Sequence, residues 1–116
     1  MKYEALFGID CGISQGFGVK YPDYVEIREE IAAGSPADAM REAVSRARYH
    51  SRNYLSNPET GKTLVTLKSV IDNDGCALDQ ESLIPETEKP RMTDDGCCIF
   101  ECSMLEHILL CMRHNC

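Results

Sequence analysis

The feature that most constrains the fold is the alternation of apolar and polar side chains in three segments of the chain. Apolar residues occupy every second position from Tyr3 to Ile9, and the same pattern returns in "YVEIREEI" at 24–31 and "KTLVTLKSVID" at 62–72. A period of two with one apolar face is typical of a half-buried β-strand. The sequence therefore predicts a sheet that is covered on one face.

A helix is predicted between the second and third of these strands. In "GSPAD", Ser35 is a suitable N-cap, Pro36 suits the first helical position and Asp38 falls in the first turn. Apolar residues then recur at helical spacing, and Asn57-Pro58 marks a stop. We expect the helix at about 36–55, with an alanine-rich stripe against the sheet.

The C-terminal half predicts shorter elements separated by a polar segment. "ALDQESLI" at 77–84 fits a short strand or a single helical turn, and "PETEKPRMTDDG" at 85–96 is typical of a polar loop. "CCIFEC" at 97–102 predicts a strand, and a capping box of Ser103 and Glu106 predicts a helix at about 103–114. The expected fold class is α+β: a single domain over 1–116, in which both helices pack on an antiparallel sheet.

The stretch "GIDCGISQGFG" at 8–18 holds four glycines and raises the question of a phosphate-binding loop. A dinucleotide fingerprint needs G-x-G-x-x-G before a helix, whereas this stretch has a different spacing and precedes a strand. It also lacks the Gly-Lys-Ser/Thr of a P-loop. We interpret the stretch as a hairpin connection in which glycine supplies positive φ angles.

Charge and composition narrow the class of partner. The net charge is −7, so a nucleic-acid backbone is repelled except at a local basic patch, and nucleic acid is not an expected partner. The densest basic segment, with arginines at 41, 46, 48 and 52, is interpreted as the solvated face of a helix. No stretch has the pattern of a signal peptide or a membrane span, so we expect a cytoplasmic protein with its seven cysteines reduced.

Catalytic and metal sites are not expected from the sequence. Cys98, Cys102, His107 and Cys111 could in principle converge on zinc, but no Cys-x-x-Cys pair is present. Cys11 follows Asp10, whose negative charge disfavours a thiolate, and the adjacent Glu29–Glu30 and Asp94–Asp95 pairs suit solvated surfaces. We therefore predict no enzyme, no cofactor and no metal.

Ligand binding is the remaining class of function, and candidate residues can be chosen for side chains that suit a phosphate or a base. Arg91, Thr93 and the Asp94-Asp95-Gly96 turn lie in the polar segment before Phe100, and Arg28 lies in an alternating strand. Guanidinium groups, a hydroxyl and turn amides can hold a phosphate, and an aromatic ring can stack on a base. An ordinary connector is the alternative interpretation of this segment.

Two families resemble parts of the chain. Residues 1–50, with "YEALF", "GFGVKYPD" and "GSPADAMREA", resemble HicB-type antitoxins, although no basic DNA-binding tail follows. The acidic chain with "GISQGFG", a capped helix and a second sheet-and-helix segment looks like phage accessory proteins, among them the Thoeris anti-defence family. That likeness implies a protein that sequesters cyclic ADP-ribose-type or cyclic nucleotide signals as an oligomer, in the host cytoplasm if phage-encoded.

These observations give one expected function and two alternatives. We expect a non-enzymatic, homo-oligomeric protein that binds a small nucleotide-like signal through Arg28, Arg91, Thr93, Asp94 and Phe100. Surplus apolar residues in the helix at 36–55 and in the C-terminal segment favour an oligomer. The first alternative is an antitoxin-like protein that masks a partner protein, and the second is a metal-stabilised structural domain.

Overall fold

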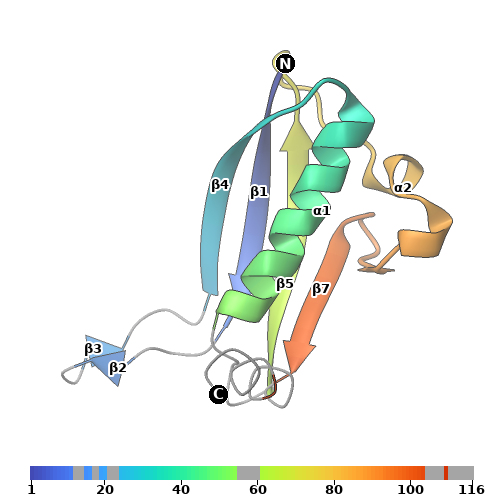
Figure 1. The fold of residues 1–116 in the computed structure, drawn as a ribbon. Coiled ribbons are helices and arrows are strands. Elements are labelled where there is room, and N and C mark those ends of the chain that lie inside the picture. The colour runs from blue at the N-terminus through green and yellow to red at the C-terminus, as the bar shows by residue number, and fades with distance from the viewer. Residues whose placement is uncertain (12–14, 17–18, 21–23, 55–60, 104–108, 110–116) are drawn as a thin grey trace.

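The computed structural model describes residues 1–11, 15–16, 19–20, 24–54, 61–103 and 109, and in them the chain forms a five-stranded antiparallel sheet with the strand order β4-β1-β5-β7-β6 (Figure 1). Every strand pairing is antiparallel, and the α+β fold class is confirmed. The strands of this sheet are β1 (Lys2–Asp10), β4 (Tyr24–Ala32), β5 (Lys62–Ile71), β6 (Arg91–Met92) and β7 (Cys98–Ser103).

The long helix α1 (Pro36–Asn53) lies on one face of the sheet (Figure 1). It connects β4 to β5, so the connection passes β1, which lies between them and is antiparallel to both, and the helix itself packs mainly on β5. Its predicted start is confirmed, because the amide of Asp38 donates to Oγ of the N-cap Ser35 at 3.2 Å and Pro36 begins the first turn. The last helical residue is Asn53 and Tyr54 is its extended C-cap, so the helix ends two residues before the predicted end at 55.

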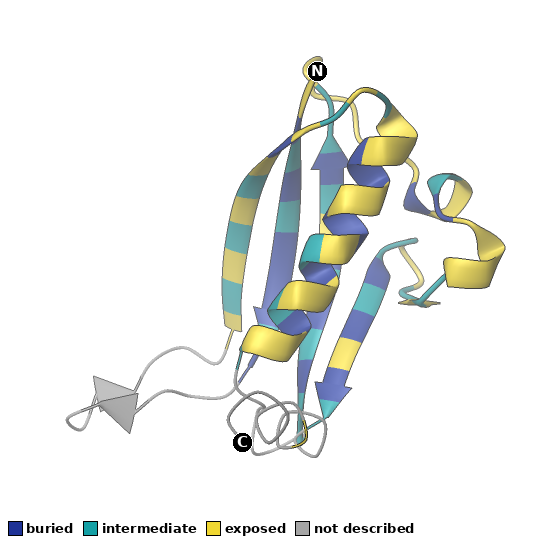
Figure 2. Ribbon diagram, in the orientation of Figure 1, coloured by how far each residue is buried: buried dark blue, intermediate teal, exposed yellow. Residues whose placement is uncertain are grey.

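The core lies between α1 and the sheet, where the buried stripes of both meet (Figure 2). Ala39, Ala43 and Ala47 of α1 have no exposed surface, so the helix backbone can lie close to the strands. Phe7, Ile9 and the alternate apolar residues of β5 and β7 fill the sheet side. The period of two that predicted these strands matches the face that α1 covers, except in β5. There a register shift against β1 leaves Lys68 as an extra residue, and the next buried position after Leu67 is Val70.

The glycine-rich stretch contains a small hairpin. Strand β2 (Gln15–Gly16) pairs with β3 (Val19–Lys20) in an antiparallel register between β1 and β4. The hairpin prediction is confirmed, whereas Gly12 and Gly18, expected to adopt positive φ, lie outside the described residues.

Two turns in the C-terminal half have the same construction, "DNDGC" at 72–76 and "TDDGC" at 93–97. In each, the first side chain accepts a hydrogen bond from the amide four residues on, at 2.9 Å for Asp72 and 3.0 Å for Thr93. In each, the glycine has a positive φ, 80° at Gly75 and 83° at Gly96, and donates its amide to the first carbonyl. The second turn brings β6 beside β7.

The segment between these turns folds around one buried side chain, Gln80. It begins the short helix α2 (Gln80–Leu83), so the helical alternative for 77–84 is confirmed, while Ala77 also forms an isolated bridge with Ile71. Gln80 Nε2 donates to the Leu67 carbonyl of β5 at 2.7 Å, and its Oε1 accepts from the Cys98 amide of β7 at 2.9 Å. These bonds attach α2 to two neighbouring strands.

The prediction of a loop at 85–96 is wrong in part. It contains the 3-10 turn η1 (Glu86–Glu88) and strand β6, whose Arg91 and Met92 pair with Ile99 and Cys98. Strand β6 has only two residues, which is too short to show an alternation of apolar and polar side chains in the sequence. Its pairing with β7 depends on the turn at 93–97. Almost all of the predicted helix at 103–114 lies outside the described residues. Its first residue, Ser103, is described and ends β7.

The sheet face opposite α1 carries cross-strand ion pairs. Arg28 contacts Glu4 at 3.0 Å and Lys68 contacts Glu26 at 2.9 Å, and this second contact lowers the pKa of Glu26. Among the described residues no helix packs on this face, and none of their helices is long and apolar enough to span a membrane. The face is thus a charged surface with isolated apolar side chains.

Replacement of Gln80 tests its role as the attachment point of α2. Gln80→Met keeps a similar volume but leaves a buried amide and a buried carbonyl without partners, so the free energy of unfolding should fall by about 2 to 4 kcal/mol. Urea denaturation measures this change. Glu81→Gln, at the exposed neighbouring position, is the control and should change it by less than about 0.5 kcal/mol. Equal stability of both variants would contradict the assigned role.

Candidate functional site

The candidate site is a groove of about 700 Å³ between α1 and the segment 83–88. Its volume lies within the range of small-molecule sites, roughly 300 to 1,000 Å³. Helix α1 provides the basic wall, and the turn after α2 provides an apolar one. The lining residues are Ala37, Arg41, Val44, Ser45, Arg48, Tyr49, Arg52, Leu83, Ile84, Pro85 and Glu88.

Three arginines line the helical wall of the groove. Arg41, Arg48 and Arg52 are separated by seven and then four residues, a spacing that places them on one helix face. Arg41 forms an ion pair with Asp38 at 3.2 Å. Arg48 lies over the ring of Phe100, 5.7 Å from its centroid, and neither Arg48 nor Arg52 pairs with a carboxylate among the described residues. The groove is therefore lined by two guanidinium groups that form no ion pair with a described residue, and by one carboxylate, that of Glu88.

The opposite wall is fixed by burial. Ile84 is 6 % exposed, and Gln80 at the start of α2 is bonded to β5 and β7. After Pro85, Lys89 contacts Glu86 at 3.0 Å and closes the 3-10 turn. The wall is held by tertiary contacts, so the groove is pre-formed in the folded chain.

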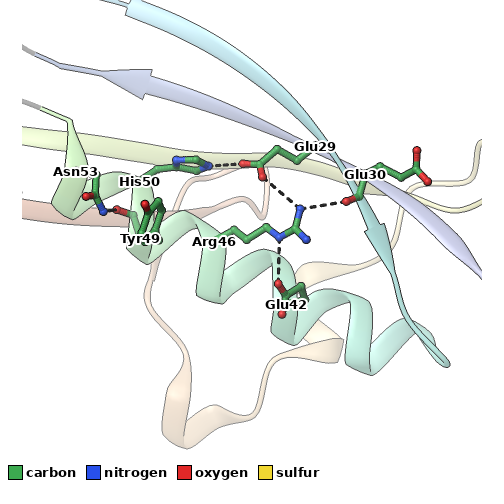
Figure 3. A network of polar contacts seen from close by, with 7 residues as sticks. All are labelled: Glu29, Glu30, Glu42, Arg46, Tyr49, His50 and Asn53. Carbon is green, nitrogen blue, oxygen red and sulfur yellow. Dashed lines mark hydrogen bonds and ion pairs between the residues drawn. The ribbon is translucent and has the colours of Figure 1, made fainter.

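The fourth arginine of the helix, Arg46, belongs to a separate polar network (Figure 3). It contacts Glu42 at 3.0 Å and Glu29 at 3.2 Å, and it donates to the Glu30 carbonyl at 3.0 Å. His50 contacts the other oxygen of Glu29 (Figure 3). The network joins α1 to β4.

The network corrects two expectations from the sequence. Glu29 was expected to be solvated, but its side chain is about a quarter exposed and contacts Arg46 and His50, because it points to the helix side of β4. Glu30, on the other face, is exposed and pairs with Lys2. The basic segment is likewise not one solvated face, because Arg46 turns to the sheet while the other arginines line the groove.

Aromatic rings surround His50 on the sheet side. The Phe7 and Tyr54 rings meet it edge-on, with centroids 5.1 and 6.0 Å away. Burial raises the pKa of Tyr54, and the nearby Cys11 and Glu29 raise it further. This environment suits packing and orientation of the imidazole.

The residues predicted to bind phosphate do not meet in one chain. Arg28 lies on β4 and Arg91 on β6, at opposite edges of the sheet, and they pair with Glu4 and Glu101 at 3.0 and 3.2 Å. Four strand spacings of about 4.8 Å separate these edges. Phe100 points to the helix side, is 6 % exposed and is in contact with Arg48.

Thr93 and Asp94 belong to the turn before β7. The Thr93 hydroxyl accepts from the Cys97 amide, and the Gly96 amide donates to the Thr93 carbonyl at 3.0 Å. These two amides already serve the turn, so they are not free for an anion. Asp94 is exposed at the tip.

The cysteines of the metal alternative are only partly described. Cys98 and Cys102 both lie in β7, within the strand predicted at 97–102, and both are buried on the helix side. In the described ranges, no group of three or more His, Cys, Asp or Glu residues could hold a metal ion. His107, Cys111, His114 and Cys116 lie outside those ranges.

Three comparisons with known proteins give no relative. No protein-family model, no curated protein and no solved structure matches the chain. The groove must therefore be interpreted from its own chemistry.

Sequence reasoning missed the groove because its second wall comes from the ambiguous segment 77–88. The signal was present in the helix, where the spacing of Arg41, Arg48 and Arg52 gives one basic face. Nothing in the sequence shows that the turn after α2 lies opposite that face, since it is placed by contacts of Gln80 that span 13 and 18 residues.

Thiol labelling tests the burial of β7. Burial raises the pKa of Cys98 to about 11, so at pH 8 its thiol should be protonated and unreactive. Cys76, exposed on the first turn, should alkylate at least about tenfold faster. Mass spectrometry of peptides from iodoacetamide-treated native protein separates the two sites. Equal rates before denaturation would show that β7 is not packed as described.

Proposed function

We propose that the protein is a non-enzymatic binding protein that sequesters a small nucleotide-like anion in the groove between α1 and 83–88. One observation carries the proposal: Arg48 and Arg52, which form no ion pair with a described residue, line a pre-formed groove in a chain of net charge −7. Exposed basic side chains in an acidic protein can pair with many carboxylates at little cost. Here they face a cavity instead, which favours an anionic ligand.

Phosphate groups suit the basic wall. Guanidinium groups bind phosphate through paired hydrogen bonds that are stronger than neutral ones. The net negative field is screened within roughly 8 to 10 Å at physiological salt, so local arginines can attract a phosphate despite the acidic surface. Arg41, already paired with Asp38, is close enough along the helix face to add a third charge.

The remaining walls suit a base and a sugar. Leu83, Ile84 and Pro85 form an apolar surface, and the exposed ring of Tyr49 can stack on an aromatic base. The Glu88 carboxylate in the lining can accept a hydrogen bond from a ribose hydroxyl or an exocyclic amine. Apolar, aromatic and basic groups together favour a nucleotide-like molecule over a simple inorganic anion.

The lining favours binding over turnover. Its described residues include no histidine or cysteine, and its hydroxyl groups belong to Ser45 and Tyr49, for which Glu88 is the one carboxylate in the lining. The resemblance to the Thoeris anti-defence family supplies a setting for such a protein, namely sequestration of a cyclic ADP-ribose-type or cyclic nucleotide signal during phage infection.

Calorimetry with cyclic nucleotides and cyclic ADP-ribose isomers tests the proposal. Arg48→Ala and Arg52→Ala should each weaken binding by at least about tenfold, because each removes a charge-assisted contact. Arg28→Ala is the matched control on the opposite sheet face and should bind as the wild type does.

Two outcomes would contradict the assignment of the binding site to this groove. Loss of binding in Arg91→Ala but not in Arg48→Ala would move the site to β6, where the sequence first suggested it. No heat with any of these nucleotides, together with a toxin-sized protein that co-purifies from a bacterial lysate, would favour the antitoxin-like alternative.

A further inference from the structure

Strand β4 forms a long edge of the sheet. It spans nine residues, pairs with β1 on one side, and has no partner strand on the other side among the described residues (Figure 1). Edge strands are usually short or interrupted by proline, lysine or a bulge, since free backbone groups invite another strand. The range 24–32 contains no proline or lysine, and its pairing with β1 has no register shift, so its protection against pairing consists of its charged side chains, Glu26, Arg28, Glu29 and Glu30.

The backbone groups that point outward can be identified. Ala33 exchanges both hydrogen bonds with Met1, so the alternate residues Ile31, Glu29, Ile27 and Val25 also bond to β1. The even-numbered residues from 24 to 32 then present their amides and carbonyls outward. The bond from Arg46 to the Glu30 carbonyl agrees with this assignment, because it reaches that carbonyl from outside the β1–β4 ladder. It uses one of the two lone pairs of that oxygen, so a partner strand would share the Glu30 carbonyl with Arg46.

Side-chain charges on the outward-bonding residues select a register. Glu26, Arg28 and Glu30 alternate in sign on the sheet face opposite α1. An antiparallel pair of two copies centred on Arg28 would set Arg28 against itself and Glu26 against Glu30. Centred on Glu29, it would also set Arg28 opposite Glu30, but it would bring the partly buried Glu29 carboxylates of the two copies against each other. Centred on Ile27, it sets Glu26 of each copy opposite Arg28 of the other.

We propose that two copies of this chain pair antiparallel through β4, with the two-fold axis at Ile27, to form a continuous ten-stranded sheet. The partly buried Ile27 side chains then meet on the helix side of the sheet. Both α1 helices lie on the same face, as a two-fold axis perpendicular to the sheet requires.

The ion pairs within one chain support this register. Lys68 contacts Glu26, and Arg28 contacts Glu4. Across the proposed interface, Glu26 of one copy lies opposite Arg28 of the other. The row then reads Lys68, Glu26, Arg28, Glu4, with four charges of alternating sign, and the two-fold axis generates it twice. This inference is independent of the groove and of the proposed function.

Charge reversal tests the pairing by sedimentation equilibrium. The wild type should form a dimer of twice the 13.0 kDa chain mass. Arg28→Glu and Glu26→Arg should each weaken self-association by at least about tenfold, because each sets like charges opposite one another at two symmetric positions. An equimolar mixture of the two variants should recover the dimer, since every facing pair is again of opposite sign.

Exchange of backbone amides gives a second measurement that needs no variant. On dilution of the wild type to monomer, the amides of Glu26 and Arg28 should lose protection, whereas that of Ile27, which bonds to β1, should keep it. A wild type that stays monomeric at 100 µM or more, or variants that associate as the wild type does, would overturn the proposal. So would protection of the even-numbered amides that does not change with concentration.

Discussion

The packing of α1 against the sheet determines which side chains of the helix face β4 and which face the groove. Ala39, Ala43 and Ala47 recur every fourth residue and are fully buried, so the helix backbone can approach the strands closely. This contact fixes the rotation of the helix about its axis. Arg46 and His50 then face β4 and the partly buried Glu29, while Arg48 and Arg52 face the opposite flank and the groove.

The second wall of the groove depends on a polar contact within the core. Gln80 satisfies one carbonyl of β5 and one amide of β7, and it attaches the start of α2 to both strands. A buried amide side chain with both ends bonded specifies a unique position, because any displacement leaves buried polar groups without partners. The apolar turn at 83–85 is therefore held opposite the arginines, and the acidic chain keeps a basic cavity.

Local patterns were sufficient to predict β1, β4, β5, β7 and the start of α1, because alternation and capping are properties of neighbouring residues. They were insufficient for β6, which has two residues and is placed by a turn, and for the groove, whose walls lie far apart in sequence. The predicted binding residues were chosen for the chemistry of their side chains, without knowledge of the strand order or of the pairing between strands. The sheet then placed Arg28 and Arg91 at opposite edges and set Phe100 beneath Arg48.

A titration followed by two-dimensional ¹H–¹⁵N NMR tests the central claim most directly, because it locates a ligand without altering the chain. With cyclic ADP-ribose or a cyclic nucleotide as the probe, the account predicts shift changes concentrated at 41–52 and 83–88, on both walls of the groove. The amides of 26–30 and 91–96 should not move. Shift changes confined to 91–96, or no changes at millimolar probe, would contradict a nucleotide-binding groove beside α1.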